Sequence, residues 1–280
     1  MKTKTLLIAA AALAVGIISS QAQSVYSQNV VGYINQPIPA GGYQIVGSQL
    51  IGGSDANQTN GDVNATLING LISSPNDPPS LSSNSVMYAW NGVGYATYYF
   101  FNQADATAWE GFAAPAGWYD SLGNPATVKL NNGNATFIQN HSTFPLTLTT
   151  TGNVLGGSVG ATNYATIHAG YNLIALQVPI STNPVVAGYG LPGNLTSSPV
   201  DPPNQNVNDA LFAWNGVGYA TYYFFNQVDA TAWEGFAAPA GFYDALGNPM
   251  PSSAYAQVNQ GFFLYHTGAS VTWTNAFQVQ

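Results

Sequence analysis

The chain contains no cysteine and very little charge. Lys and Arg together number 3 among 280 residues, against 11 Asp and Glu. Without cysteine there is no disulfide framework, so stability has to come from packing and backbone pairing. Because clustered Lys or Arg side chains are needed to hold phosphates, this composition excludes nucleic acid and anionic lipid surfaces as partners. A surface with so few charges repels its own copies only weakly, which favours self-association.

Long hydrophobic runs are also absent, except for one near the N-terminus. Leu6–Ile18 is apolar, follows Lys2 and Lys4, and precedes the small-residue segment Ser20–Ala22. This is the pattern of a secretory signal peptide, and the run is shorter than the roughly 20 residues that span a bilayer. We expect residues 1–22 to be removed and the mature chain to be secreted, to the extracellular space or the cell surface, without a transmembrane helix. Lys129 is then the only Lys or Arg residue of the mature chain.

One long stretch occurs twice. Ala89–Ala126 and Ala213–Met250 are identical at 34 of 38 positions, at a constant offset of 124 residues. The preceding loop Ser73–Pro79 (SSPNDPP) returns as Ser197–Pro203 (SSPVDPP) at the same offset. Internal repeats of this kind determine the architecture. They predict two tandem modules from a duplication, residues 23–155 and 156–280, joined in the small-residue stretch Leu155–Gly160.

Strand signals dominate both halves. Two β-rich runs within Val86–Phe101 flank Asn91-Gly92, the dipeptide best suited to a type I′ hairpin turn. No segment shows a sustained helical period. Many short strands with turn signals between them predict an all-β protein with a β-sandwich or barrel-like fold in each module. Neither face of the run that ends at Phe101 is polar. This strand is therefore covered on both sides, or it bares an aromatic face for a ligand.

The second half carries a set of short motifs in a recognisable order. They are Gly170–Ile174 (GYNLI), Phe212–Tyr219 (FAWNGVGY) and Gly261–Leu264 (GFFL), and the first half begins with Ser27–Asn35 (SQNVVGYIN). This arrangement resembles a module common in exported bacterial proteins. The resemblance implies a secreted β-rich module of unassigned function, with no catalytic residues to carry over. The first copy departs from it, because Gly42–Val46 (GYQIV) lacks the Asn and Asn134–Phe137 (NATF) replaces the aromatic closing motif.

Three acidic positions recur in both copies, and they are the candidates for catalysis: Asp105, Glu110 and Asp120, with Asp229, Glu234 and Asp244. Paired carboxylates at the right separation perform glycosidase chemistry. The alternative, which we favour, is that these acids cap or turn the chain, because β modules of this size rarely form a full cleft. The spacing Gly-x-Ser-x-Gly occurs only at Gly156–Gly160 (GGSVG), in the expected linker, and no helical period follows it as a nucleophile elbow requires. We therefore expect no enzyme activity and rank a glycoside-active enzyme third among the functions.

A calcium-like pattern in the first module fails on inspection. Asp55–Asp62 resembles an EF-type loop, but Asn60 stands where that loop needs Gly and Thr66 where it needs an acid. The second copy lacks the pattern altogether. We predict a polar loop there, and neither a metal site nor a cofactor anywhere in the chain.

The aromatic side chains of the repeated block are its most informative feature. Such rings pack protein cores, and flat polar aromatics also stack on sugar rings. For the binding alternative, Tyr99, Trp109 and Trp118 would form a platform on one face. The candidate ligand-binding set is Trp90, Tyr95, Tyr99, Trp109, Trp118, Trp214, Tyr219, Tyr223, Trp233 and Phe242.

The function expected from these observations is a secreted, non-enzymatic structural or matrix-associated protein that associates with itself or engages a repetitive partner. The alternative is a carbohydrate-binding protein that contacts a cell-surface polysaccharide through exposed aromatics. A solvent-facing set of repeated rings would favour glycan binding, whereas a sealed core with uncharged sheet edges would favour assembly.

Overall fold

The computed structural model describes residues 31–50, 63, 70–130, 133–154, 162–181, 191, 194–255 and 257–276. The predicted signal peptide, the calcium-like loop Asp55–Asp62 and the expected boundary between residues 155 and 156 lie outside this part of the chain. Within it the protein is mostly strand, with two helices of eight residues each. The all-β prediction is confirmed.

In the described residues both modules have the same order of strands and α-helices, and the second adds a short 3-10 helix, η1. The first consists of β1 (Val31–Ile38), β2 (Tyr43–Gly47), β3 (Val86–Trp90), β4 (Tyr95–Phe101), α3 (Gln103–Glu110), β5 (Gly117–Tyr119), β6 (Ala135–Gln139) and β7 (Leu146–Asn153). The second consists of β8 (Thr162–Ile167), β9 (Gly170–Ala175), β10 (Ala210–Trp214), β11 (Tyr219–Phe225), α4 (Gln227–Glu234), β12 (Gly241–Tyr243), η1 (Ser252–Ala254), β13 (Gly261–His266) and β14 (Val271–Ala276).

Each module is a two-layer antiparallel structure. A five-stranded sheet, ordered β2-β6-β3-β4-β5 in the first module and β9-β13-β10-β11-β12 in the second, faces a two-stranded sheet, β1-β7 or β8-β14. In the first module Ile38 and Leu148, from the small sheet, pack on Met87, Ile138 and the fully buried Trp118. The sandwich alternative of the prediction therefore holds, and neither sheet closes into a barrel.

The hairpin at the repeated block forms with a longer turn than the sequence suggests. Trp90 pairs with Tyr95, so four residues, not two, connect β3 to β4. The Asn91 side chain accepts hydrogen bonds from the backbone N–H groups of Val93 and Gly94, at 3.0 and 2.8 Å. The turn closed by the Asn91 side chain forms in place of the type I′ turn, so the predicted two-residue turn is wrong.

The two helices are the main element that the sequence reasoning missed. Helix α3 begins at the N-cap Asn102, whose side chain accepts a hydrogen bond from the Asp105 N–H, and it ends at Gly111, with φ of 73°. These are ordinary cap signals. A polar helix of eight residues has no apolar period to reveal it. Trp109 stacks on Phe101 with ring centroids 4.4 Å apart, so α3 covers one end of the second face of the sheet.

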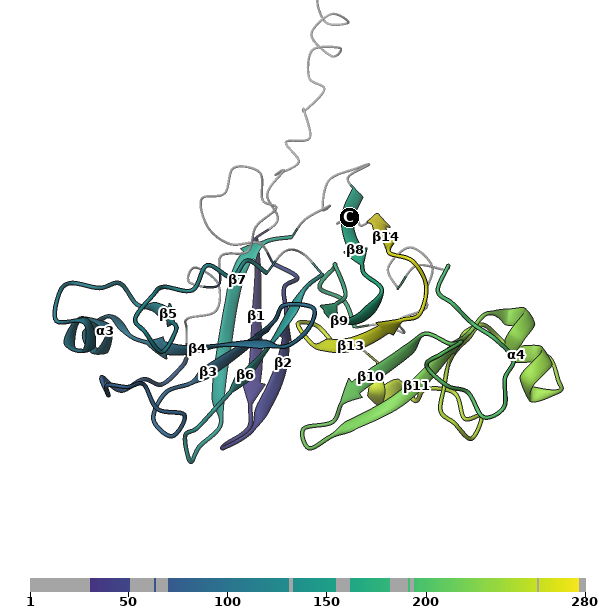
Figure 1. Ribbon diagram of the computed structural model, residues 1–280, viewed down its shortest axis with the longest axis horizontal. Helices are drawn as coiled ribbons and strands as arrows, with labels where there is room; N and C mark the ends of the chain where they lie inside the picture. The colour runs from purple at the N-terminus through teal and green to yellow at the C-terminus, as the bar shows by residue number, and fades with distance from the viewer. Residues whose placement is uncertain are drawn as a thin grey trace, which may run out of the picture.

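The remainder of that face packs against the other module around a local two-fold axis (Figure 1). The sheets meet through β2, β6, β9 and β13, while α3 and α4 lie at opposite ends of the molecule. The hydrogen bonds across the axis are reciprocal. The Gly47 N–H donates to the Asn259 carbonyl at 2.7 Å, and the Ala175 N–H donates to the Gly133 carbonyl at 2.9 Å.

Small residues allow the modules to approach closely at the axis. A Cβ built on Gly47 would lie 2.3 Å from the Cβ of Ala175, and one built on Gly261 would lie 2.4 Å from that of Ala135. Gly47 and Ala175 occupy the same place in the two modules, as do Ala135 and Gly261. Each pair that meets at the axis therefore combines one glycine with one alanine. Two alanines facing each other would clash.

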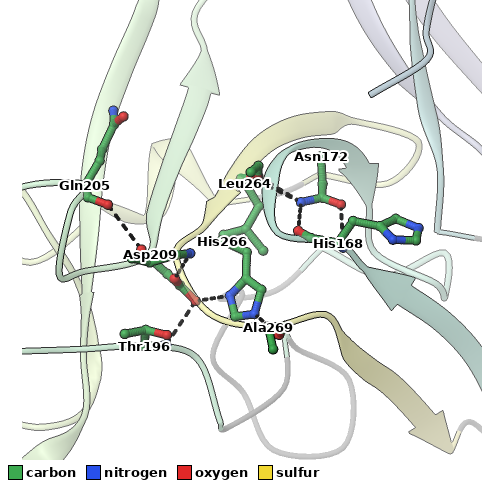
Figure 2. A network of polar contacts seen from close by, with 10 residues as sticks. His168, Asn172, Thr196, Gln205, Asp209, Leu264, His266 and Ala269 are labelled. Atoms are coloured by element: carbon green, nitrogen blue, oxygen red, sulfur yellow. Dashed lines mark hydrogen bonds and ion pairs between the residues drawn. The ribbon is translucent and has the colours of Figure 1, made fainter. Parts of the chain in front are cut away.

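A buried polar network distinguishes the second module (Figure 2). The Nδ1 of His266 lies 2.7 Å from the Oδ2 of Asp209, and its Nε2 lies 2.7 Å from the Ala269 carbonyl oxygen. Asp209 also accepts from the N–H groups of Thr196 and Thr267. Both the histidine and the aspartate are almost fully buried. The Ala269 carbonyl oxygen only accepts, so Nε2 of His266 donates to it, while Nδ1 pairs with the Asp209 carboxyl group in a buried salt-bridge contact.

Candidate functional site

Two hollows lined entirely by aromatic side chains lie where the modules meet. Pocket A, with a volume of about 350 Å³, is lined by Tyr43, Tyr88, Tyr95, Phe137, Trp214 and Tyr219. Pocket B, with a volume of about 330 Å³, is lined by Trp90, Tyr95, Tyr171, Phe212, Tyr219 and Phe263. The two sets are counterparts, residue for residue, under the local two-fold axis. Tyr95 and Tyr219 line both pockets, so the pockets are adjacent.

In each pocket one of the lining residues is a tryptophan from the opposite module. The indole N–H of Trp214 donates to the Tyr43 carbonyl at 3.3 Å, and that of Trp90 donates to the Tyr171 carbonyl at 3.1 Å. Each indole also lies against a tyrosine of its own hairpin, with ring centroids 5.1 Å apart for Trp90 and Tyr95. These contacts fix the indole rings, so both pockets are formed before any ligand arrives.

The pocket floors are sealed, while the rims are open. Phe137 and Phe263, in the shared hydrophobic cluster, are buried. Four tyrosines at the rims keep a large part of their surface in solvent: 36% for Tyr43, 44% for Tyr95, 43% for Tyr171 and 42% for Tyr219. Among the residues that the structure describes, no charged side chain lines either pocket. The arrangement suits an uncharged ligand that presents an apolar face to the rings and polar groups to the phenols.

Three phenols of the pockets, those of Tyr88, Tyr95 and Tyr219, have a raised pKa and keep their protons well above neutral pH. Burial raises the pKa of Tyr95 to about 12, and burial together with the nearby Tyr43 raises that of Tyr88 to about 12. Burial, with a smaller effect from Tyr95, also raises the pKa of Tyr219. These hydroxyls are therefore hydrogen-bond donors under all ordinary conditions.

An alkaline titration of the tyrosines tests this arrangement. The fold favours the protonated phenol, so its stabilising effect is complete below the unfolded pKa of about 10 and is lost as the pH rises toward 12. We expect a late class of tyrosines in the phenolate absorbance titration, with the contact between the modules loosening in the same interval. In Tyr88→Phe/Tyr95→Phe this late class should shrink. A titration in which all tyrosines ionise together near pH 10 would contradict the packing of the pockets.

The structure distributes the ten predicted ligand-binding residues over three environments. Trp90, Tyr95, Trp214 and Tyr219 line the pockets. Trp118 and Phe242 are 0% and 3% exposed and lie in the module cores, where neither offers a face to a ligand. Tyr99 and Trp109 pack beside Phe101, as do Tyr223 and Trp233 beside Phe225. The platform of Tyr99, Trp109 and Trp118 does not form, because Phe100 and Trp118 point to the opposite face from Phe101 and Trp109.

The sequence reasoning missed six lining residues, namely Tyr43, Tyr88, Phe137, Tyr171, Phe212 and Phe263. All six lie outside the repeated block. A signal was nevertheless present. The Tyr after Gly42 and Gly170, and the aromatic in the middle of each closing strand, occur in both halves.

The four repeated aspartates have structural roles. Asp120 accepts hydrogen bonds from the N–H groups of Leu122 and Asn124, at 2.8 and 2.9 Å, and so forms the turn after β5. Asp105, in the first turn of α3, accepts from Ser73 and Asn102 and so ties the preceding loop to the helix. Asp229 and Asp244 repeat these contacts in the second module. The turning interpretation is confirmed for Asp120 and Asp244, whereas Asp105 and Asp229 lie in the first helical turn and hold a loop, and the caps are Asn102 and Asn226.

A more polar hollow of about 490 Å³ lies elsewhere on the same seam, and Trp90 and Tyr171 also line its wall. It contains Lys129 and His168, whose side chains are both exposed. In the described ranges no three Asp, Glu, His or Cys side chains gather closely enough to hold a metal ion. None of the helices there is long and apolar enough to cross a membrane.

No family model, curated protein or solved structure matches this chain.

Proposed function

We propose that this protein is an exported, non-catalytic protein that binds an uncharged polysaccharide at pockets A and B. The observation that carries the proposal is the pair of preformed aromatic pockets with open tyrosine rims at the junction of two modules. Their volumes fall at the lower end of the roughly 300–1,000 Å³ typical of small-molecule sites. Such a pocket accommodates part of a polymer, and two adjacent pockets accommodate successive parts of it.

The chemistry of the lining favours a β-linked glucose polymer such as cellulose. In such a chain all ring hydroxyls are equatorial, so each sugar presents C–H groups on both faces and hydroxyls around its edge. Rings inclined to one another, as Trp214 and Tyr219 are at 60°, can contact a face and an edge of the same sugar. The phenol hydroxyls then bond to the sugar hydroxyls. Nucleobases also stack on aromatics, but a chain with so few cations cannot hold their phosphates.

Retention on amorphous cellulose tests the proposal. Because Tyr95 and Tyr219 each line both pockets, Tyr95→Ala/Tyr219→Ala should weaken retention by about tenfold or more, given roughly 0.5–1.5 kcal/mol for each aromatic contact. The matched control is Phe112→Ala/Phe236→Ala, which removes two equally repeated rings that are 63% exposed and lie outside the pockets. This control should bind like the parent.

Circular dichroism shows whether each variant remains folded. A mature chain that cellulose does not retain, or a folded pocket variant that binds like the parent, overturns the proposal.

Self-association, which the low charge also predicts, is the second candidate function. Several exposed apolar residues recur in both modules, among them Val93 with Val217 and Leu122 with Leu246. Sizing the same samples by light scattering measures whether this repeated surface joins copies of the chain.

A further inference from the structure

Pockets A and B share one plan but differ at two corresponding positions. In pocket A the Tyr88 hydroxyl donates a hydrogen bond to the Gln139 side-chain carbonyl oxygen at 2.7 Å. In pocket B the counterpart of Tyr88 is Phe212, which has no hydroxyl. The counterpart of Gln139 is Tyr265, whose ring packs on Tyr171 with centroids 4.8 Å apart. Pocket A therefore carries a polar pair, and pocket B carries only rings at the same place.

The polar pair of pocket A is held rigidly. Gln139 is 8% exposed, and its strand is central in the sheet, between β2 and β3. Its side-chain oxygen accepts the hydrogen bond from the Tyr88 hydroxyl, which fixes the direction of that hydroxyl. Tyr88 in turn packs against Tyr43, with ring centroids 6.2 Å apart, and against Tyr95 at 6.3 Å. A phenol and an amide fixed in this way can discriminate the hydroxyl pattern of a sugar, because a mismatch leaves a buried polar group unpaired.

The local two-fold axis makes this difference decisive for a polymer. A polysaccharide chain has a direction, from its non-reducing to its reducing end. A two-fold axis perpendicular to the chain reverses that direction, so two identical pockets would bind the chain equally well either way round. Unequal pockets remove this degeneracy, because only one orientation places the same sugar hydroxyl on the polar pair.

We propose that a single glycan chain lies across both pockets in one direction, with a sugar hydroxyl bound at Tyr88 and the neighbouring sugars stacked in pocket B. The inference rests on the proposed function and adds to it a specificity-determining residue and a binding polarity. Tyr88 contacts the sugar directly, and Gln139 positions the Tyr88 hydroxyl.

Calorimetry with cellohexaose on the intact mature chain gives the first test. We expect one hexasaccharide per protein. Tyr88→Phe should weaken binding by about three- to tenfold, as expected for the loss of one hydrogen bond. Phe112→Tyr is the matched control and should leave the affinity unchanged, because this exposed ring lies outside both pockets. Two hexasaccharides per chain, or no effect of Tyr88→Phe, would overturn the inference while leaving glycan binding intact.

The polarity is read by cellohexaose with a nitroxide at its reducing end. In the parent, paramagnetic broadening of backbone amide signals should be confined to one of the two modules. In Tyr88→Phe it should spread to both, because the two orientations become nearly equal in free energy. Broadening divided equally between the modules of the parent refutes a single direction. Failure of cellohexaose to bind the parent refutes the proposed function itself, so the two failures are distinguishable.

Discussion

Replacing His266 by Asn should lower the free energy of unfolding by about 3–5 kcal/mol, the usual cost of breaking a buried charge pair. The Asp209 side chain has no exposed surface and would lose the histidine that pairs with it. Its two backbone hydrogen bonds, from Thr196 and Thr267, would remain. Urea unfolding followed by circular dichroism measures the change.

The first module supplies the control, because it has two uncharged residues at the positions of this pair. Ser85 and Asn140 stand where the second module has Asp209 and His266. Ser85 accepts from the Ile72 N–H, much as Asp209 accepts from Thr196, and Asn140 donates to nearby carbonyls. The double variant Asp209→Ser/His266→Asn should therefore recover much of the loss. A double variant that is destabilised by the sum of the two single changes would contradict the coupling of this pair.

Replacing Trp118 by Ala should also cost about 3–5 kcal/mol, because it empties a large volume in a closed core. Trp118 has no exposed surface and lies against Phe100, with ring centroids 5.6 Å apart. The measurement is the same urea unfolding. An effect under about 1 kcal/mol would mean that the first module repacks around the gap, against the usual behaviour of large-to-small changes.

The second module again provides the matched variant. It has Phe242 at the corresponding position, packed on Phe224 with centroids 5.5 Å apart. Trp118→Phe should consequently cost less than half as much as Trp118→Ala. Any reduction in cellulose retention by Trp118→Ala should scale with the unfolded fraction, since this ring does not line pocket A or pocket B.

Local features of the sequence predicted most of each module. The β-rich runs on either side of Asn91 became β3 and β4, because alternating aromatic and β-branched residues fit a pleated sheet in any context. The repeat predicted two equal modules, because identical sequences form identical local structure. Helix α3 escaped prediction for a related reason. Its signals are the caps Asn102 and Gly111 and not a period, and tertiary packing of Trp109 supplies what the pattern lacks.

The sequence predicted four of the ten residues that line the two pockets. Trp90, Tyr95, Trp214 and Tyr219 were chosen because they recur in the block, and they line the pockets. Trp118 recurs in the same way and is buried, because side chains alternate between the faces of a strand and its face is the core. The choice between these faces depends on what covers each one.

By itself, the sequence determined the strands, the duplication, the absence of disulfides and the scarcity of charge, because each of these is a local or compositional property. Only the tertiary structure decided where the aromatic rings meet. Pocket A joins Tyr43 of the first module to Trp214 of the second, and the two are brought together by the docking of the modules across the local two-fold axis. That docking depends on a glycine facing an alanine at Gly47 and Ala175. No spacing along the chain encodes such a contact, since it requires both modules to be folded first.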